Sequence, residues 1–128
     1  PSGHVKHEVI VPNLVVTTGK NFIASRMKDA SATAMTHMAI GTGSTAAAAG
    51  NTALGSEAGR VALTSTTVTD NAVAYVATFA AGTGTGAITE AGLLNASSSG
   101  TLLCRTVFSV INKASADTLG ITWTVTVS

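Results

Sequence analysis

Two glutamates and two arginines stand out as residues that could do chemistry in a sequence with few charges. A pair of carboxylates such as Glu57 and Glu90 could cleave a glycosidic bond by general acid and base catalysis. Aromatic side chains that would carry a sugar ring are scarce, however, with one Trp and one Tyr. Charges flanked by apolar residues need partners. We therefore expect Glu57, Arg60, Glu90 and Arg105 to form one partly buried ionic cluster that ties loops together, although the sequence does not indicate which carboxylate meets which arginine.

Motifs for metal binding, nucleotide binding and nucleophilic catalysis are all incomplete. His4 and His7 are spaced i, i+3, but no Cys or carboxylate with ligand spacing accompanies them. Gly19-Lys20 is followed by Asn21 rather than by the Ser or Thr of a phosphate-binding loop. Cys104 lies inside an apolar run and is typical of a small buried hydrophobe. The sequence therefore predicts no catalytic, metal-binding or cofactor-binding residues, and we interpret the chain as a protein that is not an enzyme.

The composition is unusually poor in charge. Only 10% of the 128 residues are charged, against roughly 25% in an average soluble domain. Surfaces that pack against other subunits are depleted in Lys, Glu and Asp, so the composition favours a subunit packed against neighbours; Thr-rich outer strand faces are the alternative. The net charge of +1 without a basic run argues against nucleic-acid binding. Neither a signal sequence nor a membrane-spanning apolar run is visible.

The second half of the chain alternates apolar and polar residues, which predicts strands. In the clearest run, residues 118–127, Leu, Ile, Trp and Val on one face alternate with Thr on the other, as in a half-buried strand. Two further alternating runs, 61–65 and 73–79, flank a hairpin turn at Asp70-Asn71. The remaining strands are expected at 101–111 and, broken at Glu90, at 87–94.

A short helix near residues 20–28 is expected ahead of these strands, with Thr17 or Thr18 as its cap. Its buried stripe, at helical spacing, would comprise Phe22, Ile23 and Met27. Short strands separated by Gly, Ser and Asn favour a mainly β fold, an antiparallel β-sandwich with one short α-helix near the N-terminus. The predicted core contains Trp123, Phe79, Phe108, Leu63 and Ile121.

Residues 1–16 are interpreted as an N-terminal arm that precedes a single β-sandwich domain at 17–128. An exposed apolar segment with β propensity invites aggregation. We therefore expect residues 5–16 either to pack across a neighbouring subunit or a particle surface by strand addition, or to add an edge strand to their own sandwich. The apolar residues of this assembly arm are Val9, Ile10, Val11, Leu14, Val15 and Val16.

Three short segments occur in a recognisable order. They are Ala39-Ile40-Gly41-Thr42-Gly43, then Thr52 to Arg60 with Leu54 and Glu57 inside it, and then Ile88-Thr89-Glu90-Ala91-Gly92-Leu93. In this order they resemble the phage tail-collar and tail-fibre N-terminal family, whose segments follow A-x-G-x-G, T-x-L-x-x-E-x-x-R and I-x-E-x-G-L. The likeness spans about residues 18–127.

This resemblance implies a non-enzymatic structural protein of a tailed-bacteriophage virion, a small oligomeric tail-fibre or collar attachment subunit. Its partners would be itself, as a dimer or trimer, and other virion proteins of the tail, collar or capsid, with neither nucleic acid nor a membrane. Its place would be the particle surface, after assembly in the host cytoplasm. A capsid decoration (cement) protein that stabilises the phage head is the alternative. A carbohydrate-binding module is a further one, which the scarcity of aromatic residues disfavours.

Overall fold

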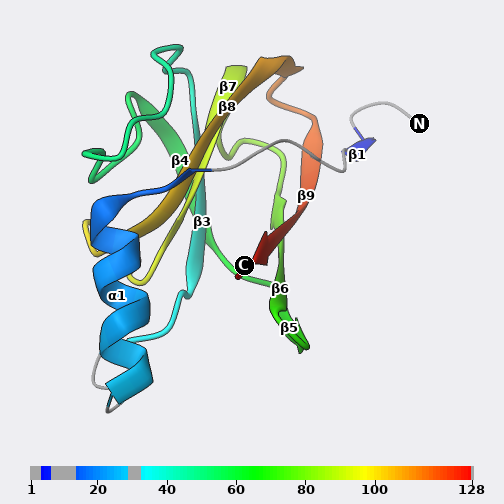
Figure 1. The fold of residues 1–128 in the computed structure, drawn as a ribbon. Coiled ribbons are helices and arrows are strands. Elements are labelled where there is room, and N and C mark those ends of the chain that lie inside the picture. Colours follow the sequence, from blue (N-terminus) through cyan, green and yellow to red (C-terminus); the bar gives the residue numbers. More distant parts are fainter. Residues whose placement is uncertain (1–3, 7–13, 29–32, 128) are drawn as a thin grey trace.

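The computed structural model describes residues 4–6, 14–28 and 33–127, which form two β-sheets and one helix (Figure 1). One sheet has the strand order β1-β9-β6-β5 and the other has the order β2-β8-β7-β3-β4. Apart from the short parallel pair of β1 and β9, the paired strands are antiparallel. The predicted fold class, mainly β with one short helix, is confirmed. The elements are β1 (His4–Lys6), β2 (Leu14–Val15), α1 (Thr17–Lys28), β3 (His37–Gly41), β4 (Glu57–Ala62), β5 (Ser65–Thr69), β6 (Ala72–Phe79), β7 (Gly86–Leu94), β8 (Leu102–Lys113) and β9 (Thr118–Thr126).

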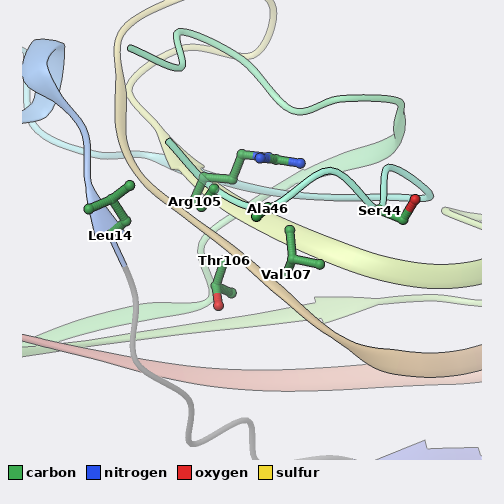
Figure 2. A pocket seen from close by; sticks show the side chains of 7 residues that line it. Leu14, Ser44, Ala46, Arg105, Thr106 and Val107 are labelled. Atoms are coloured by element: carbon green, nitrogen blue, oxygen red, sulfur yellow. The ribbon is translucent and has the colours of Figure 1, made fainter. Parts of the chain in front are cut away.

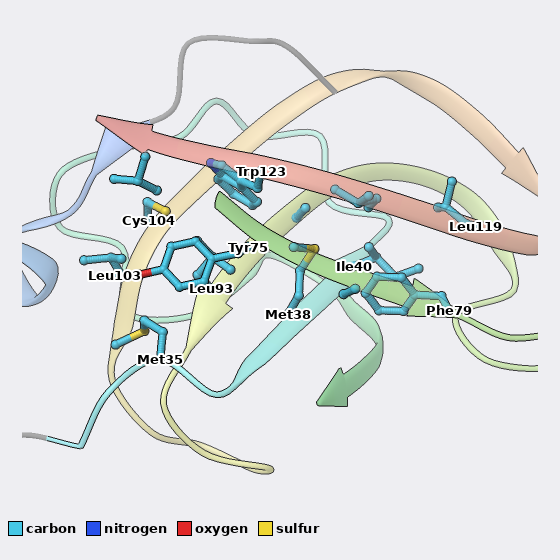
Figure 3. Close-up of a cluster of buried hydrophobic side chains, with 14 of the residues drawn as sticks. Met35, Met38, Ile40, Tyr75, Phe79, Leu93, Leu103, Cys104, Leu119 and Trp123 are labelled. Atoms are coloured by element: carbon cyan, nitrogen blue, oxygen red, sulfur yellow. The ribbon is translucent and has the colours of Figure 1, made fainter. Parts of the chain in front are cut away.

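The main core fills the space between the two sheets (Figure 3). Strands β6 and β9 contribute its aromatic side chains, because alternate residues of these strands face inward. Trp123, Phe79 and Ile121 are buried as predicted, whereas Phe108 and Leu63 are only partly buried and pack against the core. The opposite sheet contributes Met38, Ile40, Ile88, Leu93, Leu103 and Cys104.

A second, smaller apolar cluster lies on the opposite face of the sheet that contains β3, β7 and β8. Ala39 lies between the inward-facing Met38 and Ile40, so its side chain points to this outer face. The loop of residues 42–56 reaches the cluster through Leu54. The members of this cluster are Val16, Ala39, Leu54, Leu94 and Leu102.

Helix α1 begins at Thr17, three residues before the predicted start. The Thr18 hydroxyl donates to the Leu102 carbonyl over 3.0 Å, so it holds the helix to β8 instead of capping it. Phe22 and Ile23 pack against the core as expected. The prediction for Met27 is wrong, because its side chain is 83% exposed. The helix touches β8 near its first turn, where Gly19 approaches the Leu103 backbone, and Met27 lies in the last turn.

Two strand boundaries differ from the prediction. The alternating run 61–65 is divided between β4 and β5, which belong to different sheets. The expected break at Glu90 is instead a shift of register between Ile88 and Glu90 within one continuous strand. The hairpin turn at Asp70-Asn71 is confirmed, and Asp70 adopts a positive φ of 52° there.

The described parts of the predicted arm pair with the chain's own sheets. Residues His4–Lys6 pair with the beginning of β9, and Leu14–Val15 pair with Arg105 and Cys104 of β8. This pairing corresponds to the second expectation for the arm, an edge strand added to its own sandwich. Val16 is fully buried, and Leu14 and Val15 pair with β8, so residues 14–16 pack with the sandwich. Val9, Ile10 and Val11 lie outside the described residues.

Candidate functional site

The four charged residues singled out in the sequence lie on the outer face of one sheet. On β3, Gly41 pairs with Glu57 of β4 on one side and with Glu90 of β7 on the other. Two residues earlier on the same face, Ala39 pairs with Arg60 of β4 and with Gly92 of β7, which in turn pairs with Arg105 of β8. Because residues two apart on a strand share a face, the fold gathers these four residues in two neighbouring rows.

Within those rows the residues form two ion pairs, not the single cluster that we expected. Arg105 and Glu90 are 2.9 Å apart, and their side chains are 2% and 0% exposed. Arg60 and Glu57 are 2.7 Å apart and lie nearer to solvent, with 9% and 32% of their side chains exposed. Among the residues that the structure describes, no salt bridge joins the two pairs. Strand β3 lies between them with Ala39 and Gly41 at the facing positions, so no side chain there can bridge the gap.

The Glu90 carboxylate is the hydrogen-bonding centre of the loop 42–56. Its Oε1 accepts hydrogen bonds from the Gly55 N–H at 2.8 Å and from Arg105 Nε at 2.9 Å. Its Oε2 accepts from the N–H groups of Gly43 and Ser56, each at 2.7 Å. One buried side chain therefore holds both ends of the loop.

Arg105 holds the middle of the same loop. Its Nη2 donates to the Thr45 carbonyl at 2.9 Å, and its Nη1 donates to the Asn51 side chain at 3.1 Å. Asn51 Oδ1 also accepts from the Ala48 N–H at 2.8 Å. Asn51 was not among the residues predicted from the sequence, where its only signal is its position directly after Gly50.

Glycine residues make this close arrangement possible. A Cβ atom on Gly43 would collide with Oε2 and the carboxyl carbon of Glu90, and one on Gly41 would collide with the Ser56 carbonyl as well as with Glu90. Thr89 adds a further bond, because its hydroxyl donates to the Gly43 carbonyl at 2.7 Å. The glycines of the first segment are therefore explained by the space that the Glu90 side chain and the Ser56 carbonyl occupy.

The ionisation of Glu90 follows from these contacts. Burial by itself would raise the pKa of this carboxyl group, but the N–H groups of Ser56 and Gly55, the Arg105 side chain and the Gly43 N–H together outweigh burial. The pKa of Glu90 is therefore lower than its ordinary value, and the carboxylate stays ionised. An ionised carboxylate with both oxygens occupied is suited to holding a loop, not to transferring a proton.

Two open hollows are each lined in part by Arg105. One has a volume of about 500 Å³ and is bordered by Leu14 of β2, by the loop and by β8 (Figure 2). The other has a volume of about 370 Å³ and lies on the loop itself, between Thr45 and Gly55. Small neutral residues dominate both linings, and the Arg105 donors are already bound to the loop and to Glu90. Arg105 is the only charged residue among those that line the two hollows.

Other side chains that could act as nucleophiles, acids or bases are buried or hydrogen-bonded within the fold. Cys104 is buried in the core as predicted, and burial raises the pKa of its thiol. Lys113 was not singled out in the sequence, yet it is buried and its Nζ donates to the Ala80 carbonyl at 2.9 Å. His37 Nδ1 lies 2.7 Å from the Thr36 hydroxyl. Among the described side chains, no three of His, Cys, Asp and Glu are grouped so that they could hold a metal ion.

The Glu90–Arg105 pair thus holds the loop 42–56 in a defined shape. No described helix is long and apolar enough to cross a membrane. No protein-family model, no curated protein and no solved structure matches the chain. The function has to be inferred from the Glu90–Arg105 pair, from the loop that it holds and from the surface around them.

Proposed function

We propose that this chain is a non-enzymatic structural subunit of a tailed-bacteriophage particle, a small self-associating attachment module of the tail collar or tail fibre. One observation carries the proposal: the three sequence segments that resemble the phage family meet at one buried centre. Glu90 of the third segment accepts hydrogen bonds from Gly43 of the first and from Gly55 and Ser56 of the second. The convergence gives the three segments a common structural role, which is to fix the loop 42–56 beside β3, β4 and β7.

The contacts of the charged residues support a structural role. The oxygens of Glu90 and the donors of Arg105 are bound to each other and to the loop 42–56. The aromatic residues also argue against a sugar-binding platform, which needs an exposed ring. Trp123, Tyr75 and Phe79 are buried, and the remaining two, Phe22 and Phe108, pack partly buried against the core.

The surface of the loop supports attachment by contact rather than by charge. Between Thr42 and Ser56 the chain contains no charged residue, and most of its side chains are exposed. Electrostatic steering contributes little to association when both surfaces are neutral. A loop that is already held by buried hydrogen bonds loses less conformational freedom on binding than a free one. We therefore propose that the loop 42–56 is one of the surfaces on which the particle's other proteins pack.

Labelling of intact particles tests the proposal. Antibodies raised against the purified chain, carried on gold beads, are applied to particles of the phage that encodes it and imaged by electron microscopy. We expect label at the collar or along the fibres. Label distributed over the head would identify the decoration role instead. Particles without any label above the background of a phage lacking the gene would contradict a virion role altogether.

A further inference from the structure

The outer edge of β5 is an exposed edge of the four-stranded sheet. All five residues from Ser65 to Thr69 are exposed, so both faces of the strand are open to solvent. Within the described residues β5 pairs with β6 alone, which leaves the other edge of the strand unpaired. Figure 1 shows the hairpin of β5 and β6 at the lower right, away from strand β3 and from helix α1.

This edge lacks the features that normally prevent one sheet from pairing with another. Natural edge strands are protected by charged side chains, by proline, by bulges or by being very short. Ser65 to Thr69 contains neither charge nor proline, and its register with β6 is unbroken over five residue pairs. Nothing in the strand therefore prevents the addition of another strand.

An apolar row also runs outward to this edge. Val125 of β9 is buried, Val73 of β6 packs partly buried against the core, and Val68 of β5 is their neighbour in the same row. Val68 is nevertheless 69% exposed. The inner face of the sheet thus continues beyond the part that the second sheet covers, and Val68 lies at its uncovered end.

We infer that β5 is a self-association edge, at which β5 of a second copy pairs in antiparallel orientation around a two-fold axis at Thr67. The inference takes from the proposed function only that the chain associates with itself. It adds that β5 is the surface through which it does so. In this register Ser65 lies opposite Thr69 of the second copy, and Thr66 lies opposite Val68. The two four-stranded sheets then become one continuous sheet, and each Val68 gains a neighbour that covers it.

The residues of β5 favour a second copy of the same chain as the partner that pairs with this edge. A two-fold interface brings the same patch of both subunits together, so the patch must be complementary to itself. The paired residues are Ser, Thr and Val throughout, and no like charges oppose one another. The nearest charge, Asp70 in the turn, lies opposite Thr64 of the second copy, so the two aspartates stand at opposite ends of the paired segment.

Sedimentation velocity of the full chain is the first test. We expect the parent chain to sediment as a dimer, and Val68→Lys to sediment as a monomer at the same concentrations. The substituted strand carries a charge at the edge, and the two lysines would lie diagonally across the axis from each other. Val110→Lys is the matched control, because Val110 is 52% exposed but lies on β8. It should remain dimeric, and circular dichroism should be unchanged in both variants.

Disulfide cross-linking is the second test and reports the register. Antiparallel residues directly opposite each other have Cα atoms about 4.5–5.5 Å apart, within the range of a disulfide. Thr67→Cys should therefore form a covalent dimer on mild oxidation, while the buried Cys104 does not react. Thr124→Cys is the control on the same sheet face. Its two copies would be five strand spacings, about 24 Å, apart, and should not cross-link.

Several outcomes would overturn the inference: a monomeric parent, a dimeric Val68→Lys variant, a monomeric Val110→Lys variant, or equal cross-linking of the two cysteine variants. These outcomes are separate from the particle-labelling result. A monomeric parent that still labels phage particles would overturn the edge pairing and leave the virion role. A dimer that pairs through β5 but labels no particle would do the reverse.

Discussion

Glu90 occupies a position where an unpaired charge would be strongly destabilising. Transfer of an isolated carboxylate from water to the protein interior has a large free-energy cost, and here three backbone N–H groups and Arg105 replace the lost water. The same groups belong to the loop 42–56 and to β8, so the ionised side chain both requires the loop and fixes it. Because most of its partners are backbone N–H groups, Glu90 can be buried in a chain in which only 10% of residues are charged.

Replacing Glu90 by glutamine should be strongly destabilising. Glu90→Gln leaves Arg105 buried without its counter-charge. It also places the NH2 group of the new amide against groups that now donate hydrogen bonds to the carboxylate. Removal of one partner of a buried pair costs about 3–5 kcal/mol, which urea denaturation would measure. Glu57→Gln is the matched control, and it should cost at most about 1 kcal/mol because that pair is nearer to solvent. Equal losses in the two variants would contradict the distinction between the pairs.

Acid should weaken the fold through the same residue. The pKa of Glu90 is lower in the folded protein than the unfolded value of about 4.3. The stability contributed by the ionised carboxylate is therefore complete above the unfolded pKa and is lost as the pH falls toward the folded pKa. Urea midpoints measured from about pH 6 down to about pH 3 should decline below the unfolded pKa. If the urea midpoint of Glu90→Gln declined equally steeply with falling pH, the loss of stability would come from other titrating groups.

The sequence predicted which charged residues matter but not how they pair. Glu57, Arg60, Glu90 and Arg105 were recognisable because so few other charges are present. Their division into two pairs depends on β3 lying between β4 and β7, and nothing local to the four residues determines that strand order. The partners of Glu90 are mostly backbone N–H groups, whose positions no side-chain pattern indicates.

At the level of elements, the contact between α1 and β8 depends on a residue without a side chain. A Cβ atom at Gly19 would meet the Leu103 backbone. Gly19→Ala should therefore lower the free energy of unfolding by about 1–3 kcal/mol through overpacking, although the same change in an exposed helix position stabilises by about 1 kcal/mol. Asn21→Ala, at an exposed position of the same helix, should be neutral or slightly stabilising. Urea denaturation of both variants checks the sign, and stabilisation by Gly19→Ala would contradict this packing.

The alternation of apolar and polar residues predicted β9 correctly, but it did not predict that the chain changes sheet between β4 and β5. One face of β9 is buried along its whole length, so the period of two is visible in the residue types. At the corner the chain passes from one sheet to the other. The Leu63 N–H donates to Thr36, next to β3, while the Thr64 N–H donates to Val76 of β6. No glycine or proline marks this change, so a continuous alternating run concealed it.

For the molecule as a whole, the core between the sheets should account for most of the stability. Trp123→Ala should lower the free energy of unfolding by about 3–5 kcal/mol, because the buried indole leaves a cavity between β6 and β9 on one side and the opposite sheet on the other. Urea denaturation would measure the loss. Thr124→Ala, the next residue on the exposed face, serves as control and should change stability little. A Trp123→Ala midpoint equal to that of the parent would contradict the position of β9 in the core.

The pairing of β1 with β9 and of β2 with β8 also has a kinetic consequence. Contacts between residues far apart in sequence form slowly, because the entropy of closing the intervening chain is lost before the contact stabilises anything. On the ribosome, β1 and β2 emerge before β8 and β9, and they cannot pair until those two strands have followed. The hairpin of β5 and β6 needs only its own short turn and can form during synthesis. Strands β1 and β2 are therefore made well before the strands with which they pair.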